Sequence, residues 1–344
     1  MAQSTRRAFL AGLTVAAGVA RLGPALVFAR SQQTAEYRFI QFHNQAEPSS
    51  LHQRLVQMWS AIRNETGGRV DAQVFAENRH VAGSDPAALA MLVRGEIQFF
   101  TLMGGILGNL VPAAEVQQVP FAFRSASAAQ RAMDGPLGRY VARELAAKGV
   151  FALPVSVFDN GLRQIATRTK PIVRPDDLAG MKIRVPDGRM FHDVFSAFGA
   201  EPVTINVDGI YGALKSGAVE AQENPLAVVE LFKIYEVVKY MSVTNHMWSG
   251  FNLIAHLPTW NRLPADLQRV IARNASRYVR RQRNDQAGLN GALRRRLASR
   301  GLVFNDPVAA APFRARLSGV YAAWKERLGR ECWSLLEAET GRLS

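Results

Sequence analysis

The sequence is short of cysteine, of closely spaced metal ligands and of long apolar runs, and each shortage excludes a class of protein. Its 344 residues include one cysteine, Cys332, which excludes an intrachain disulfide and a metal cluster built on several thiolates. No HExxH motif or equivalent close pair occurs, so a metal site has little support. The six histidines are scattered: His43, His52, His80, His192, His246 and His256. Beyond residue 30 no apolar run is long enough to span a bilayer, so we expect a soluble mature chain.

Motifs that mark an enzyme are also missing. No glycine-rich phosphate loop of the Walker or Rossmann type follows a strand pattern, and no G-x-S-x-G turn occurs. Asp176 and Asp177 lie in a polar "RPDDLAG" stretch typical of a helix cap, and Glu223 is a candidate acid that stands alone. We therefore predict a protein that is not an enzyme and needs no cofactor.

The first 30 residues have the layout of an export signal. "STRRAFLAGLTVAAGVA" joins a charged start to an apolar core, and "PALVFA" precedes Arg30. The adjacent Arg6 and Arg7 resemble a twin-arginine export signal, and an ordinary secretory leader with two arginines is the alternative. We expect a periplasmic protein whose leader is cleaved near residue 30.

Acidic residues are outnumbered, since 28 Asp and Glu accompany 42 Lys and Arg, for a formal net charge of +14. A cut before Arg30 removes Arg6, Arg7 and Arg21 and no acidic residue, which lowers the net charge by three, to +11. This surplus attracts acidic partners over long range: a small anion, a membrane surface or nucleic acid. An exported protein rarely meets nucleic acid, so a small anion is the expected partner.

Strand and helix patterns alternate in the first part of the mature chain. "YRFIQFHNQ", "RVDAQVFA" and "EIQFFTLM" have strand patterns, and two helix patterns separate them. The first helix is indicated by apolar residues at helical spacing, namely Leu51, Leu55, Met58, Trp59 and Ile62. This β-α-β-α-β order predicts a doubly wound α/β lobe.

The same order returns between "LAGMKIRVPD" and "AVEAQENP", which predicts a second lobe. Two β-rich runs, residues 151–169 and 239–257, are long enough to cross between the lobes. Residues 264–300 predict long, arginine-rich helices. A nucleic-acid interface is one interpretation of them, but apolar residues recur at helical spacing without interleaved aromatics, which favours a solvated helix face.

The predicted fold is therefore α/β, with two lobes, a ligand cleft between them, crossing strands and long C-terminal helices. After an export signal at 1–30, we assign 31–160 and about 250–289 to lobe I. We assign 161–249 and about 290–344 to lobe II.

Anion-binding side chains stand at predicted strand ends, where open α/β sheets bind ligands. Arg163 follows "DNG", Arg184 follows "GMKI", and Asn224 ends "AVEAQEN". The structural alternatives are a salt bridge from Arg184 to Asp187 or Glu201, and a turn that Asn224 forms with the proline after it.

Three blocks of the sequence resemble the solute-binding proteins of tripartite ATP-independent periplasmic (TRAP) transporters, of the dicarboxylate-binding type. They are "NGLRQIATRTKPIVRPDDLAGMKIRVP", "FGAEPVTINVDGIYGALKSGAVEAQENP" and "YEVVKYMSVTNH", and "ETGGRVDAQVF" and "QQVPFAF" extend the likeness. The resemblance implies two α/β lobes around a cleft, a small organic acid as ligand, and membrane permease subunits as partners. It also implies that Arg184 pairs with the ligand carboxylate, that Arg163 is a second anion contact, and that Asn224 faces the ligand.

Two loops depart from the family pattern, and they leave the ligand open. "FAENRHVAG" replaces the usual P-x-G-x-L-G turn, and "TLMGG" stands where many members have a serine-rich turn. Phe158, Trp248 and Phe251 are expected near the cleft, with core packing as the alternative. We therefore expect a 2-oxo or 2-hydroxy monocarboxylate, with or without an aromatic ring, and a C4-dicarboxylate or a uronate as runner-up. A ligand-sensing subunit for a membrane signalling protein, or an enzyme exported by the twin-arginine route, are the alternative functions.

Overall fold

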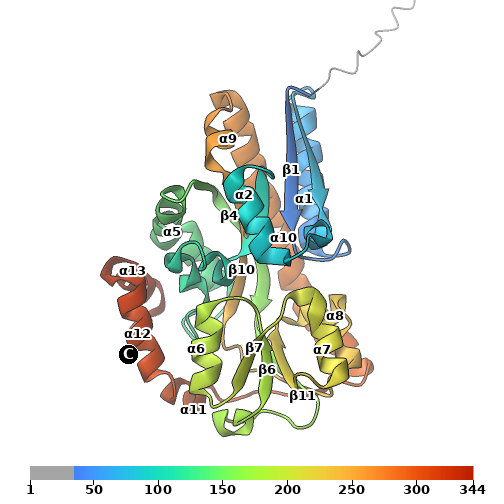
Figure 1. Cartoon of the computed structure of the whole chain (residues 1–344), viewed down its shortest axis with the longest axis vertical. Helices are drawn as coiled ribbons and strands as arrows, with labels where there is room; N and C mark the ends of the chain where they lie inside the picture. Colours follow the sequence, from blue (N-terminus) through green and yellow to red (C-terminus); the bar gives the residue numbers. More distant parts are fainter. Residues whose placement is uncertain (1–34, 344) are drawn as a thin grey trace, which may run out of the picture. The chain divides into compact units, whose positions relative to one another are not determined.

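The computed structural model describes residues 35–343, and its strands form two sheets (Figure 1). The first sheet has the order β2-β1-β3-β10-β4 and belongs to the first lobe; these strands are Val70–Phe75, Tyr37–His43, Phe99–Met103, Trp248–His256 and Val150–Leu162. The second has the order β11-β9-β5-β8-β6-β7 and belongs to the second lobe; these strands are Val303–Asn305, Tyr240–Ser242, Gln164–Thr167, Ala221–Asn224, Lys182–Val185 and Glu201–Thr204. The two predicted β-α-β runs are confirmed.

Helices cover both sheets (Figure 1). Those from the first half of the chain are α1 (Ser50–Glu65), α2 (Ser84–Arg94), α3 (Gly104–Leu107), α4 (Ala126–Asp134) and α5 (Pro136–Ala146). Those of the second lobe are α6 (Arg189–Ala197), α7 (Ile210–Ser216) and α8 (Leu226–Leu231). The C-terminal ones are α9 (Leu257–Asn261), α10 (Ala265–Ser299), α11 (Ala310–Ala315), α12 (Ser318–Leu328) and α13 (Arg330–Thr340).

Both predicted crossings occur, and they meet at one point. The first run ends as β4 in the first sheet at Leu162 and resumes as β5 in the second sheet at Gln164. The second run passes from β9 to β10 in the opposite direction. At the junction the backbone N–H of Arg163 donates to the carbonyl oxygen of Met247 at 2.8 Å. Arg163 therefore stands where the two lobes join.

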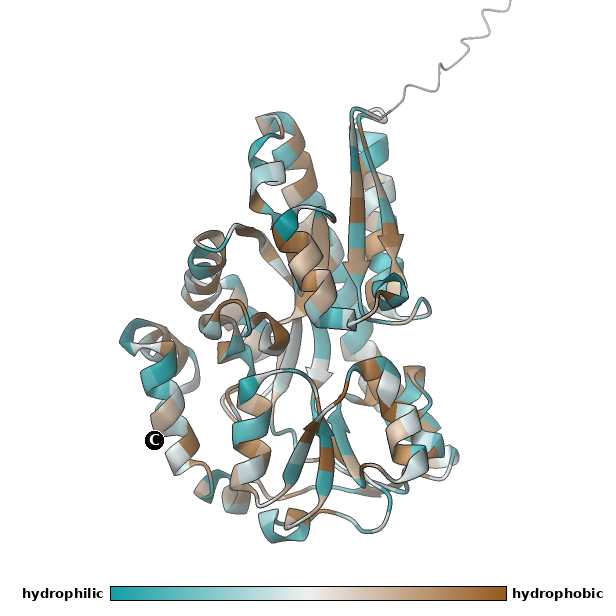
Figure 2. Cartoon of the chain, in the orientation of Figure 1, coloured by the Kyte–Doolittle hydropathy of each residue, from teal (hydrophilic) through white to brown (hydrophobic). Residues whose placement is uncertain are grey.

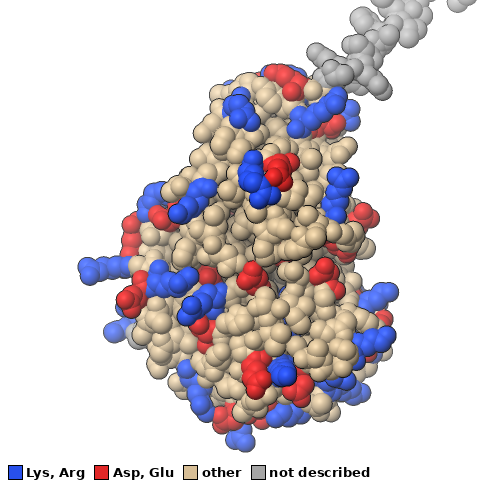
Figure 3. Space-filling model, viewed as in Figure 1, with Lys and Arg blue, Asp and Glu red and all other residues tan. Residues whose placement is uncertain are grey.

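The arginine-rich segment forms one helix, α10, whose inner face packs on β4 and α1. Ile271, Ala275 and Val279 are buried at helical spacing. Arg283 also turns inward, because its guanidinium donates to the carbonyl oxygen of Val157 at 2.7 Å. On the face shown in Figure 3, Lys and Arg stand among Asp and Glu rather than in one continuous basic patch. A solvated helix face accounts for this segment better than a nucleic-acid interface.

Apolar side chains concentrate on the strands and on the helix faces that pack on them (Figure 2). The helices after residue 300 contact both lobes, since α13 packs on α5 and α12 packs on α6. The predicted lobe boundaries therefore stay a proposal, above all the boundary near residue 290. Within residues 35–343, no helix combines the length and apolar character that a membrane span requires.

The first unusual loop, "AENRH", forms a left-handed turn between β2 and α2. Glu77, Asn78, Arg79 and His80 have φ values of 50°, 49°, 52° and 53°. A left-handed conformation costs roughly 1–2 kcal/mol for each residue that has a Cβ atom. Asn78 tolerates it best and is fully buried, whereas its neighbours in the turn are partly or fully exposed.

Glu115 of the first lobe caps a helix of the second. It lies in the 3-10 segment Pro112–Gln118, and its Oε2 accepts a hydrogen bond from the backbone N–H of Met190, in the first turn of α6, at 2.8 Å. Burial raises the pKa of Glu115 to about 7, although the Met190 N–H and the charge of Arg327 lower it. The carboxyl group therefore holds a proton more tightly in the folded state than in the unfolded chain.

This raised pKa predicts that folding stability falls as the pH rises from about 4.5 to about 7, because the unfolded carboxyl ionises first. Glu115→Gln keeps an acceptor for Met190 and cannot ionise. Between pH 4.5 and pH 8, the free energy of unfolding of the variant should rise by about 2–3 kcal/mol relative to that of the native protein. Each tenfold difference in proton affinity between the folded and unfolded states corresponds to about 1.4 kcal/mol. Urea unfolding at both pH values measures the difference. Glu326→Gln, an exposed change on α12, is the control, and parallel pH profiles for Glu115→Gln and the native protein would contradict the account.

Candidate functional site

Arg184 places a buried guanidinium on β6, the strand next to the edge strand β7 of the second sheet. It lies on β6 in register with Gln222 on β8, and its side chain is only 2% exposed. Its Nε donates to the carbonyl oxygen of Ile205 at 2.7 Å, and this is the guanidinium's only hydrogen bond to residues 35–343. Neither Asp187 nor Glu201 forms the salt bridge that was the structural alternative. The two terminal nitrogens are therefore free to bind a planar anion.

Burial lowers the pKa of Arg184 to about 9, against the opposing charge of Glu223. The group stays cationic at neutral pH, but it has lost most of its hydration. A carboxylate that binds the fork with two parallel hydrogen bonds replaces that hydration and the missing charge partner.

Arg163, in contrast, is already bound by the protein. Its Nε and Nη2 pair with the two carboxylate oxygens of Glu223, and Nη2 is 2.6 Å from Oε1. Nη2 also reaches the Glu223 carbonyl oxygen at 2.8 Å and Oδ1 of Asn224 at 3.2 Å. Nη1 has only the hydroxyl of Ser249 at 3.3 Å and the sulfur of Met103 at 3.5 Å. A thioether sulfur is a weak acceptor, so Nη1 is the part of Arg163 that a ligand oxygen can use.

Glu223 does not stand alone, which corrects the expectation from sequence. Besides Arg163, its carboxylate meets Nε2 of His246 at 3.2 Å, and both side chains are fully buried. Burial acts to raise the pKa of Glu223, but Arg163 and His246 outweigh it and lower that pKa. Burial lowers the pKa of His246, so this histidine is neutral and donates one N–H to the carboxylate. The cluster fixes Arg163 in place.

Asn224 is also held by neighbours. Its amide nitrogen donates to Oε1 of Gln222 at 2.6 Å, while its oxygen accepts from Arg163. Gln222 was not singled out in the sequence. Its amide nitrogen is buried and has no partner among the described residues, and its strand position is in register with Arg184. A free donor beside the guanidinium extends the anion-binding face of the second sheet.

Asp85, at the start of α2, faces this guanidinium from the first lobe. It is 3% exposed, and its two carboxylate oxygens accept from the amides of Asn44 at 2.8 Å and Asn78 at 2.6 Å. Burial raises the pKa of Asp85; the two amides oppose that change, and the charge of Arg184 opposes it further. The two charges therefore act on each other across the cleft without an ion pair between them.

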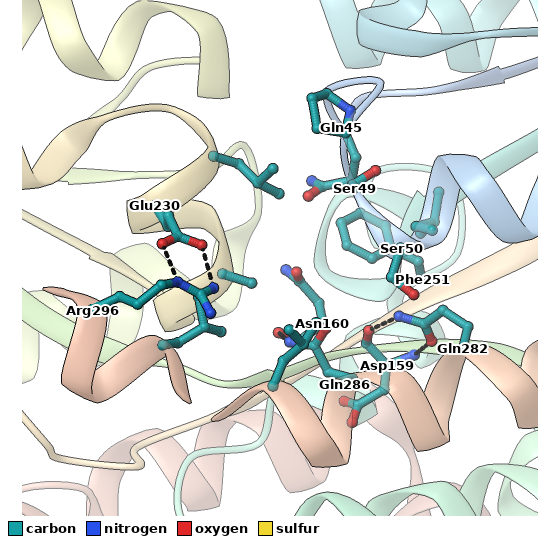
Figure 4. A pocket seen from close by; sticks show the side chains of 16 residues that line it. Gln45, Ser49, Ser50, Asp159, Asn160, Glu230, Phe251, Gln282, Gln286 and Arg296 are labelled. Carbon is teal, nitrogen blue, oxygen red and sulfur yellow. Dashed lines mark hydrogen bonds and ion pairs between the residues drawn. The ribbon is translucent and has the colours of Figure 1, made fainter. Parts of the chain in front are cut away.

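A cavity of about 180 Å³ opens between the lobes, and Arg184, Arg163, Asn224 and Asp85 are not among its lining residues. Gln45, Ser49 and Phe251 line it from the first lobe, and Glu230 with Arg296 closes the opposite side (Figure 4). Asn160 lines it as well and donates to the hydroxyl of Ser249 at 3.3 Å, the same hydroxyl that Arg163 contacts. The hydroxyl of Ser249 therefore links the cavity wall at Asn160 to the arginine cluster.

Two of the three aromatic candidates, Phe158 and Trp248, lie in the core, whereas Phe251 lines the cavity. Phe158 is fully buried and Trp248 is 1% exposed. The indole N–H of Trp248 donates to Oδ1 of Asp159 at 2.9 Å, and its ring meets Phe123 edge-on, 6.4 Å between centroids. These contacts fit the core-packing alternative, and a ligand contact by either ring stays a prediction.

Known proteins match the chain over most of its length. Residues 42–327 match the model of the family described as bacterial extracellular solute-binding protein, family 7. An uncharacterized protein from Sinorhizobium fredii is 32% identical over 78% of this chain and 48% of its own length, so the chain spans about half of that relative. A TRAP periplasmic solute-binding protein from Roseobacter denitrificans, solved with β-D-glucuronate, is 26% identical, with a TM-score of 0.84 over 88% of this chain and 99% of its own. One from Sulfitobacter sp. NAS-14.1, solved with β-D-galacturonate, is 25% identical, with a TM-score of 0.83 over 88% and 100%.

Arg184 should dominate binding of an organic acid. Arg184→Ala removes a charge-assisted pair of hydrogen bonds, and a loss of about 1.5–3 kcal/mol corresponds to at least tenfold weaker affinity. Arg184→Lys should also lose at least tenfold, because a point charge cannot replace the fork. Calorimetry with D-glucuronate measures both variants. Lys182→Ala, which removes an exposed cation from the same strand, should bind like the native protein, and unchanged affinity in either Arg184 variant would contradict the assignment.

Proposed function

Since the chain belongs to family 7 of the bacterial extracellular solute-binding proteins, we propose that its ligand is a hydroxylated organic acid and that Arg184 binds the carboxylate. The receptor delivers this ligand to the membrane permease subunits of a TRAP transporter. The observation that carries the proposal is the contrast between two buried arginines. Nε and Nη2 of Arg163 are bound by Glu223, whereas the guanidinium of Arg184 has a single backbone partner among residues 35–343.

The proposed role is binding without chemistry. Glu223 and His246 are the acid and base nearest to the arginines, but each is held by buried partners: Arg163 for Glu223, and Thr244, at 2.8 Å, for His246. Such an arrangement orients a guanidinium rather than exchanging protons with a ligand. We also propose that the lobes close over the bound acid, which is the usual motion of two-lobed receptors.

Among organic acids we favour a hexuronate. Two relatives of similar fold were solved with glucuronate and galacturonate, at 26% and 25% identity. Asp85, Asn78 and Asn160 supply polar groups at the candidate site, while Phe158 and Trp248 are covered by the protein itself. This choice reverses the order expected from sequence, where a 2-oxo or 2-hydroxy monocarboxylate, with or without an aromatic ring, came before a uronate.

We propose that the protein is exported and that its leader is cleaved near residue 30, by the twin-arginine route. The proposal rests on the sequence pattern around Arg6 and Arg7, which lies outside the described residues. The family is extracytoplasmic, in agreement with export. The mass of the mature protein recovered from the periplasm checks the cleavage position.

A panel of acids at equal concentration tests the ligand class. D-glucuronate or D-galacturonate should raise the unfolding temperature most, because a ligand that binds only the folded state stabilises it by RT ln(1 + [L]/Kd), about 2.7 kcal/mol at 100 times Kd. Succinate, pyruvate and phenylpyruvate should raise it less. A larger rise in unfolding temperature with phenylpyruvate would favour an aromatic acid as the ligand. No rise with any carboxylate would contradict the receptor role.

A further inference from the structure

Helix α10 carries a large positive charge that ligand binding does not use. Its nine arginines and two aspartates give the helix a net charge of +7. The inner face packs on β4 and α1 and also contacts α8 of the second lobe. Some arginines serve these contacts, since Arg283 pairs with Asp134 at 2.6 Å and Arg296 pairs with Glu230 at 2.7 Å. The arginines of the outer face are left to be explained.

Four of them form a row along the outer face of the helix. Arg269, Arg273, Arg277 and Arg280 are separated by four, four and three residues, and all four are exposed. Steps of three and four residues return to the same side of an α-helix, so the four side chains leave the helix in one direction. At 1.5 Å per residue, this arginine row is about 16 Å long.

The protein neutralises little of the charge in the arginine row. Only Arg273 has a carboxylate partner, because its Nη2 lies 2.6 Å from Oε2 of Glu65. The other three arginines of the row form no hydrogen bond or ion pair with the described residues. Asp266, near the same end of the helix, is bound by Arg69 at 3.0 Å. Like charges one helical turn apart repel each other, and an anionic partner would relieve that repulsion.

The surroundings of the row indicate which kind of anionic partner fits. A protein interface has an apolar core with aromatic anchors, and single-stranded nucleic acid stacks its bases on exposed rings. The only aromatic residue of α10 is Tyr278, and it is 7% exposed. A bilayer with anionic headgroups requires neither feature. It requires a line of cations that can lie along a flat surface, and guanidinium groups bind phosphate through two donors.

We propose that the arginine row binds the receptor to the anionic phospholipid headgroups of a membrane surface. This role goes beyond capture of an organic acid and does not depend on it, because none of the four arginines lines the cavity or contacts Arg184. The permease subunits of a TRAP transporter lie in a membrane. Binding to that surface raises the concentration of the receptor around them.

Co-sedimentation with lipid vesicles tests the proposal on the mature protein recovered from the periplasm. The protein should bind vesicles of phosphatidylglycerol and phosphatidylethanolamine, and it should not bind vesicles of phosphatidylcholine and phosphatidylethanolamine, which carry no net charge. About 1 M NaCl should release it, since the Debye length is then about 3 Å. Equal binding to both kinds of vesicle, binding to neither, or binding that persists at this salt concentration would overturn the proposal.

A triple variant, Arg269→Gln with Arg277→Gln and Arg280→Gln, locates the surface. Glutamine supports a helix about as well as arginine, so the fold should be kept. Binding to anionic vesicles should weaken at least tenfold, because each arginine near an anionic surface contributes to the attraction. Its affinity for D-glucuronate in titration calorimetry should equal that of the native protein. Native binding of the vesicles by this variant would refute the role of the row.

The matched control removes three exposed arginines on or beside α4 and α5. Arg124→Gln, Arg131→Gln and Arg139→Gln together lower the net charge by the same amount. This control should bind anionic vesicles as the native protein does. An equal loss in the control would assign the attraction to net charge and overturn the row. Release of the native protein from the vesicles by duplex DNA at equal phosphate concentration would assign the row to nucleic acid and overturn the membrane role.

Discussion

The buried pair of Arg163 and Glu223 is the interaction on which the rest of the site depends. Moving two charges out of water is costly, and the cost is offset only when the geometry is good and the remaining donors are satisfied. Here the pair is bidentate, with further contacts to the Glu223 carbonyl and to His246. Arg163 lies between β4 and β5, where the chain passes from one lobe to the other. Its pairing with Glu223 therefore holds this connection against the end of β8. The carboxylate of Glu223 is thereby committed to Arg163, and Arg184 has no ion pair with residues 35–343.

The same cluster explains the second glycine of the "TLMGG" turn, Gly105. The guanidinium of Arg163 stacks over the ring of Phe191, 5.1 Å from its centroid, and Phe191 belongs to α6 of the second lobe. A Cβ atom on Gly105 would collide with that ring, and one on Gly188 would lie 2.8 Å from the Gly105 carbonyl oxygen. A serine-rich turn would not fit here. The lobes therefore meet closely beside Arg163, and Glu115 caps α6 along the same contact.

Local patterns predicted the elements but not their partners. The strands and helices of the two β-α-β runs and both crossings follow from periodicity over a few residues, and the resemblance pointed to Arg184. Glu223 was misread as solitary because its partner Arg163 lies 60 residues away and their contact exists only once β5 pairs with β8. Asn78 was seen only as a departure in a loop, since no propensity predicts four consecutive positive φ values. Aromatic character alone could not show whether Trp248 lies in the core or in the cleft. Its indole N–H donates to Asp159, a partner that tertiary packing supplies.

The central claim is that Arg184 is a buried cation without a charge partner until a carboxylate binds, and replacing the acid by its amide tests it most directly. D-glucuronamide keeps the ring and hydroxyls of D-glucuronate and removes only the charge. Titration calorimetry of both ligands on the native protein should give at least about 100-fold weaker binding of the amide, because a neutral group leaves the guanidinium buried without its charge partner. Equal affinities for acid and amide would contradict the account.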